Sequence, residues 1–250
     1  MPSILSLIGA SWTFYRKQPV LNWVLVWFLI MPQTLLNMLS RLMEGTRYPF
    51  LQALPDKKLT ILLVLPGFLL LTLIIIWGVA CVLVVCRRII QSRAGRARTS
   101  FATLRKEAAP YILPLFFTSI LRSCFTLFWA ILLVVPGIIY SIRTTFYAVV
   151  VVAEDISYRA ALHRSTTMVK GRTGQIFWIL LGMNVLLFLP AIMVTAALEF
   201  SPFFTLTDWL IPLADIIESS FFGLAVILSL IASVELFAAI KKRNPIEVEL

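Results

Sequence analysis

Long apolar runs constrain the fold of this chain more than any other feature. A helix needs about 20 apolar residues to cross the roughly 30 Å hydrocarbon core of a bilayer. Runs of this kind cover residues 19–39, 59–86, 174–198 and 213–240. Of the 250 residues, 60% are hydrophobic and only 14% are charged, a composition that a water-soluble domain of this size could not bury. We therefore predict an all-α integral membrane protein.

The apolar stretch 111–153 is too long for one span. Pro136 and Gly137 stand near its middle, and a Pro-Gly pair is typical of a turn. We therefore predict a hairpin of two spans, 111–135 and 138–153, which brings the total to six. The second of these would reach only about 24 Å as a helix. We expect it to continue as helix beyond its apolar end or to lie beside thinner bilayer.

The positive charges predict how the chain is oriented. If the N-terminus is inside, 16 of the 22 Lys and Arg residues fall in inner segments and 4 in outer ones. This asymmetry predicts that both termini lie in the cytoplasm. The net charge of +10 would suggest nucleic acid in a soluble protein, but no basic stretch with interleaved aromatic residues supports that partner. We expect the lipid bilayer as the partner, with anionic headgroups at the cytoplasmic face.

Three short segments have the pattern of amphipathic helices at the cytoplasmic interface: 4–15, 100–109 and 158–170. Ser3 is a candidate N-cap of the first. In the third, one face carries Ala161, Leu162, Ser165, Met168 and Val169.

A set of residues between positions 134 and 177 forms a moderately specific pattern. It consists of Pro136, Gly137, Arg143, Glu154, Asp155, Ala161, Ser165 and Gly171. In this pattern the chain resembles the membrane-domain family named after glycerophosphodiester phosphodiesterases, together with related YciC-like bacterial membrane proteins. The resemblance implies a six-helix protein of the bacterial inner membrane and no activity.

The same pattern has a physical interpretation that concerns packing. We expect Pro136 and Gly137 to close the outer hairpin. Ala161 and Ser165, four residues apart, form a small-residue face that allows a helix to approach closely. Gly171 can adopt the left-handed conformation that ends a helix.

Ionisable residues inside spans are candidate functional groups, because charge is costly there. Arg122 lies near the middle of the third span, and Arg143 lies six residues beyond Gly137, roughly 9 Å deep at helical rise. Asp215 and Glu218 enter the outer part of the sixth span. Because Arg143, Asp215 and Glu218 lie at similar depths, we predict that Arg143 pairs with Glu218 or Asp215. Candidate partners of the deeper Arg122 are Glu218, Asn184, Ser123 and backbone carbonyls near Pro190.

Two hypotheses account for these polar groups. They could line a water-filled cavity for an anionic solute or a lipid headgroup, or they could be contacts that fix the helices relative to one another. We favour the second hypothesis and expect a non-enzymatic membrane bundle or scaffold. The alternative is a transporter or lipid-handling protein with Arg122 and Arg143 along its path.

No enzyme motif, metal site or cofactor is expected. The sequence has no HExxH or GxSxG motif and a single histidine, His163. Cys81, Cys86 and Cys124 lie in apolar runs without the spacing of zinc ligands. We expect all three to be buried small hydrophobic residues.

Overall fold

The computed structural model describes residues 2–43, 57–90, 100–200 and 210–243, and every element in them is a helix. Six of the helical segments are long and apolar enough to cross a membrane, so the predicted all-α multi-pass membrane fold is confirmed. The elements are α1 (Ile4–Lys17), α2 (Val20–Val24), the π-helical η1 (Leu25–Ile30), α3 (Met31–Met43), α4 (Lys57–Ile90), α5 (Phe101–Ala108), the 3₁₀ turn η2 (Ala109–Tyr111), α6 (Ile112–Leu132), α7 (Val134–Arg143), α8 (Tyr147–Ala153), α9 (Tyr158–Val169), α10 (Thr173–Glu199) and α12 (Ile211–Arg243).

Helix α12 is the centre of the packing. More than half of its apolar stretch is buried (56%), against 11% for the stretch formed by α5 and α6. It packs against α1, α3, α4 and α10, and its side chains Ile231, Leu236 and Phe237 are fully buried. The core of the molecule therefore follows the length of α12, while α6 lies at its margin.

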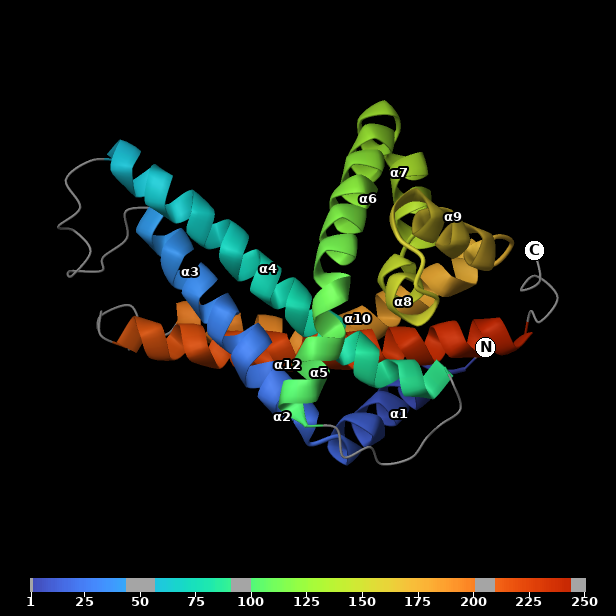
Figure 1. Ribbon diagram of the computed structural model, residues 1–250, viewed down its shortest axis with the longest axis horizontal. Coiled ribbons are helices and arrows are strands. Elements are labelled where there is room, and N and C mark those ends of the chain that lie inside the picture. The colour runs from blue at the N-terminus through green and yellow to red at the C-terminus, as the bar shows by residue number, and fades with distance from the viewer. Residues whose placement is uncertain (1, 44–56, 91–99, 201–209, 244–250) are drawn as a thin grey trace.

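Three pairs of helices form hairpins: α3 with α4, α6 with α7, and α10 with α12. The first two extend away from α12 in different directions (Figure 1). The predicted spans leave two outer connections besides the hairpin, 40–58 and 199–212, and most of each lies outside the described residues.

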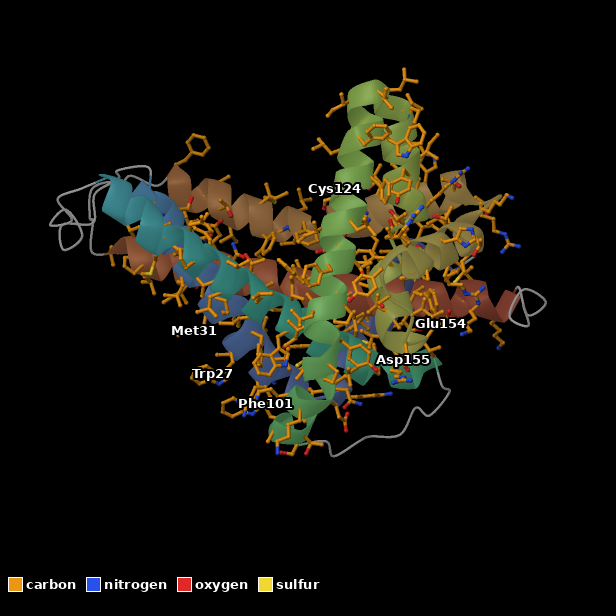
Figure 2. The ribbon with its side chains drawn as sticks, turned by 45° about the horizontal axis from the view of Figure 1, so that its top comes forward. Trp27, Met31, Phe101, Cys124, Glu154 and Asp155 are labelled. Atoms are coloured by element: carbon orange, nitrogen blue, oxygen red, sulfur yellow. The ribbon has the colours of Figure 1, made fainter. Side chains whose placement is uncertain are left out.

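The sequence signals at helix ends have mixed outcomes. The side chain of Ser3 accepts a hydrogen bond from the backbone N–H of Ser6 and so caps α1 as predicted. Gly171 has a φ of +81°, the left-handed stop predicted after α9. Cys81 and Cys86 are buried as expected, but Cys124 is exposed on the projecting part of α6, so that prediction is wrong (Figure 2).

The prediction that Pro136 and Gly137 form the hairpin turn is also wrong. The chain turns at Leu133, whose backbone is extended, and α7 begins at Val134. Pro136 therefore lies in the first turn of α7, where its missing N–H would have had no helical partner. Gly137 is buried against α6, because a Cβ on it would lie only 2.9 Å from the backbone N and Cα of Ala130.

The fourth span is not the continuous helix predicted over 138–153. It begins four residues earlier and is interrupted at residues 144–146, between α7 and α8. Both the Thr144 and Phe146 side chains are fully buried at this break. An interruption inside an apolar bundle needs partners for the backbone groups that it leaves without helical hydrogen bonds.

The close approach at Gly137 leads to a prediction about the α6–α7 hairpin. Gly137→Ala should destabilise the protein by about 1–3 kcal/mol, because the new methyl group would push the two helices apart. Where there is space for the methyl group, replacing a helical glycine by alanine instead stabilises the helix by about 1 kcal/mol. Gly174→Ala is the matched control, since nothing lies within 4 Å of its Cβ position. Thermal unfolding in detergent measures both, and equal midpoints for the two variants would contradict the prediction.

Candidate functional site

The break between α7 and α8 brings together the largest set of polar contacts among the predicted site residues. Ser165 on α9 is fully buried and bridges the break. Its hydroxyl donates to the backbone carbonyl of Arg143 (2.8 Å) and accepts from the backbone N–H of Phe146 (3.2 Å). Ser165, predicted as part of a small-residue face, thus also supplies the hydrogen bonds that the broken helix lacks.

Arg122 on α6 contacts the same break from the other side. Its Nη2 donates to the carbonyl and the hydroxyl of Ser141 (3.1 and 3.2 Å), and its Nε donates to Oγ1 of Thr144 (3.1 Å). The guanidinium lies 5.3 Å from the ring centroid of Tyr147, in a cation–π contact. A cation at the carboxyl end of α7 is also favoured by the partial negative charge of a helix C-terminus.

The partners predicted for Arg122 are therefore wrong, since it contacts a carbonyl and a hydroxyl of α7, a hydroxyl at the break and a ring of α8. A signal for this was present in the sequence. Residues 140–147 read YSIRTTFY, a polar run inside an apolar span. Such a run suggests a local site, but it does not indicate which helix supplies the cation.

Arg143 does not pair with Asp215 or Glu218, so the predicted ion pair is wrong. Its guanidinium forms no ion pair with any described residue, and its buried Nε has no hydrogen-bond partner among them. Arg172, at the start of α10, likewise has a buried Nη1 without a partner in the described part of the chain.

Asp215 pairs instead with Arg41, which lies beyond the end of the predicted apolar run 19–39. Arg41 lies in the last turn of α3, and its Nη2 and Nε are 3.0 and 3.1 Å from Oδ1 of Asp215. The Asp215 side chain is completely buried. Glu218 lies half-buried about one turn further along α12. This contact ties α3 to α12 far from the break.

Asn184 belongs to neither set of contacts. Its side-chain oxygen accepts a hydrogen bond from Ser229 of α12 (2.8 Å), and its amide donates to the carbonyl of Leu180 (2.8 Å). The five predicted intramembrane residues are thus distributed over separate contacts and do not converge on one site.

Glu154 and Asp155, which follow α8, form a charge network that the sequence analysis did not predict. Glu154 contacts Arg164 of α9 (3.0 Å) and Lys241 of α12 (2.7 Å). Asp155 contacts Arg87 of α4 (3.0 Å) and accepts a hydrogen bond from Tyr111. Figure 2 shows both acidic residues on the same side of the molecule. This network joins the ends of α4, α8 and α12 to α9. We call these helix ends, together with α9, the basic end.

A cavity of about 530 Å³ also lies at the basic end, between the ends of α4 and α12. Ile89, Ile90, Ala238 and Ala239 supply its apolar lining, and Glu235, Lys241 and Lys242 its charged groups. None of the predicted site residues lines it. Within the described residues, no group of three His, Cys, Asp or Glu side chains could hold a metal ion.

The fold and these contacts define the class of the molecule as a multi-pass helical membrane protein. No protein-family model matches the sequence, and no curated protein or solved structure matches the chain. The resemblance of the segment 134–177 to that membrane-domain family therefore stays a prediction.

The bridging role of Ser165 leads to a second prediction. Ser165→Ala should destabilise the protein by about 1–3 kcal/mol, because it leaves a buried carbonyl and a buried N–H without their partner. Ser220→Ala is the matched control, since that hydroxyl bonds only to the carbonyl of Ile216 in its own helix. Chemical unfolding in detergent compares the two, and the prediction fails when both variants lose the same stability.

The network at Glu154 predicts how stability depends on pH. Burial alone would raise the pKa of the Glu154 carboxyl, but hydrogen bonds and charge from Lys241 and Arg164 outweigh it and lower the pKa below its ordinary value of 4.5. A carboxyl with a lowered pKa stabilises the fold above that ordinary value, and the contribution is lost as the pH falls through the lowered pKa.

We therefore expect the wild-type protein to lose stability on acidification below about pH 4.5. Glu154→Gln should be less stable at neutral pH and should lose less on acidification, since it lacks the titrating group. Glu107→Gln, on α5 and outside the network, is the control. Unfolding midpoints measured across this pH range provide the test, and parallel curves for Glu154→Gln and wild type would count against it.

Proposed function

We propose that the protein is a non-enzymatic bundle or scaffold of the bacterial inner membrane, with both termini in the cytoplasm. In this proposal Arg122, an arginine in an apolar segment, serves to hold the protein's own helices together. The observation that carries this proposal is the set of contacts made by Arg122, whose Nη2 bonds to Ser141 of α7 and whose Nε bonds to Thr144 at the break. A cation bound in this way is a structural contact.

The other polar residues support the same function. Asp215 is paired with Arg41, and Asn184 is bonded to Ser229. Each contact joins two helices that are adjacent in the fold. Such hydrogen bonds stabilise helix association where lipid removes the hydrophobic driving force.

The proposed orientation rests on the distribution of positive charge. Arg87, Arg164 and Lys241 gather at the basic end, and 16 of the 22 basic residues belong to segments on that side of the predicted topology. We assign the basic end to the cytoplasm by the positive-inside rule, where it would meet anionic headgroups. The proposed membership in the phosphodiesterase membrane-domain family agrees with this placement.

The alternative function, transport or handling of an anionic solute or headgroup, has one observation in its favour. The Nε of Arg143 and the Nη1 of Arg172 are buried and lack partners among the described residues. Such groups are costly unless a ligand or water satisfies them. This alternative depends on Arg143, since Arg122 is engaged within the protein.

A stability measurement on Arg122 tests the structural role. Arg122→Gln should lower stability by about 1–3 kcal/mol, because the end of α7 loses its donors. Arg122→Lys should recover part of the loss, since a single ammonium replaces a planar fork of donors. Arg159→Gln, which removes an exposed arginine of α9, is the control and should change little.

Flux from vesicles separates the two functions. The protein is reconstituted into vesicles of phosphatidylethanolamine and phosphatidylglycerol loaded with inorganic phosphate. The scaffold proposal expects no release above protein-free vesicles. Release by the wild type that is lost in Arg143→Gln, at unchanged stability, would establish the alternative instead.

A further inference from the structure

We propose that the cavity between the ends of α4 and α12 binds the headgroup of a zwitterionic aminophospholipid such as phosphatidylethanolamine. In this arrangement Lys242 binds the phosphate, Glu235 binds the ammonium, and the acyl chains stay in the surrounding bilayer. Such a site goes beyond the scaffold function proposed above. It requires that the basic end lies at a membrane surface, whichever leaflet that is, so the site and the proposed orientation can fail separately.

Glu235 is an ionisable residue inside the apolar part of α12 that has no partner among the described residues. It stands between the buried side chains of Val234 and Leu236. Its carboxylate forms no hydrogen bond or ion pair with any described residue. A charge in an apolar span is costly and marks a candidate functional site. Because Glu235 lines the cavity, a ligand held there can supply the missing partner.

Glu235 and Lys242 lie on the same face of α12, because seven residues make about two helical turns. Ala238 and Ala239 line the cavity between them, and their small side chains leave the space that the cavity occupies. Residues 235 and 242 are separated by about 10 Å of helix. A Glu and a Lys side chain are together long enough to reach an ammonium and a phosphate that are joined by two carbons.

The charges that line the cavity match a zwitterion better than an anion. Lys241 already donates to Glu154 (2.7 Å), whereas Lys242 forms no ion pair with any described residue. The lining thus offers one ammonium and one carboxylate that are unpaired within the described part of the chain. The headgroup of phosphatidylglycerol would pair with Lys242 and leave Glu235 unpaired. Ethanolamine also brings an ammonium, which donates charge-assisted hydrogen bonds to a carboxylate.

The size and the place of the cavity fit a headgroup. Its volume of about 530 Å³ lies within the range of roughly 300–1,000 Å³ that is usual for small-molecule sites. It lies at the basic end, where the ion pairs of Glu154 and Asp155 indicate the boundary with water. Ile89 and Ile90 form its apolar wall on α4, which suits the glycerol and first methylene groups of a lipid. This wall favours a lipid over a soluble phosphoamine.

Native mass spectrometry of the full chain in nonionic detergent tests the site. The delipidated protein is titrated with phosphatidylethanolamine or with phosphatidylglycerol of the same acyl chains. We expect the wild type to bind phosphatidylethanolamine more tightly. Glu235→Gln should weaken this binding about tenfold, because a charge-assisted contact is lost, and should leave phosphatidylglycerol binding unchanged. Lys242→Gln should weaken the binding of both lipids, since both carry the phosphate.

Glu107→Gln and Lys170→Gln are matched controls, because they remove exposed charges outside the cavity, and they should bind both lipids as the wild type does. Ala238→Leu is a second probe in case Glu235→Gln does not fold. It fills part of the cavity, keeps the charges and should weaken the binding of both lipids. Equal binding of phosphatidylethanolamine by the wild type and Glu235→Gln would overturn the proposal. A preference of the wild type for phosphatidylglycerol would overturn it as well.

Free phosphoethanolamine distinguishes a lipid from a soluble ligand with the same charged groups. Added at the concentration of the lipid, it should leave phosphatidylethanolamine bound, because it lacks the apolar part that contacts the wall of α4. Full displacement at that concentration would show that the charged groups alone suffice and would overturn the assignment of a lipid to this cavity.

Discussion

The interruption between α7 and α8 is the constraint on which the arrangement of the polar residues depends. A broken helix among apolar side chains must find hydrogen-bond partners within the protein, because lipid supplies none. Arg122 of α6 provides donors to the end of α7, and Ser165 of α9 bonds to backbone groups on both sides of the break. Since these partners come from separate helices, satisfying the break also joins α6, α7, α8 and α9 into one unit.

The charge network attaches this unit to the rest of the molecule. Glu154 follows directly after α8 and reaches Lys241 at the end of α12, while Asp155 reaches Arg87 at the end of α4. Phe146, at the break itself, packs against Phe237 of α12. The acidic turn thus couples the broken span to the two helices that form much of the core, and it does so at the basic end, where water can solvate the remaining charge.

The helices could be predicted from the sequence, because apolar length and composition depend on residue type alone. The turn of the hairpin could not, since Pro136 is as acceptable in the first turn of a helix as in a loop, and only the contact of Gly137 with Ala130 shows which applies. The pairing of Asp215 could not be predicted either. It depends on the direction in which α3 leaves the centre, and that direction places Arg41 beside α12. Position along a span indicates how deep a residue lies in the membrane. Many residues lie at each depth, so depth alone does not identify the partner of Asp215.

Helices in lipid gain little from burying apolar surface against one another, so a few polar contacts and close backbone approaches decide which helices associate. The α6–α7 hairpin shows the consequence. The hydrogen bond from the Tyr158 N–H to Thr118 joins α6 to α9, and the close approach at Gly137 joins α7 to α6. Apolar side chains near the tip of the hairpin, such as Ile131 and Val134, are exposed and suited to contact lipid. A segment of this kind needs an apolar surface on every side, which is the composition that residues 128–139 have.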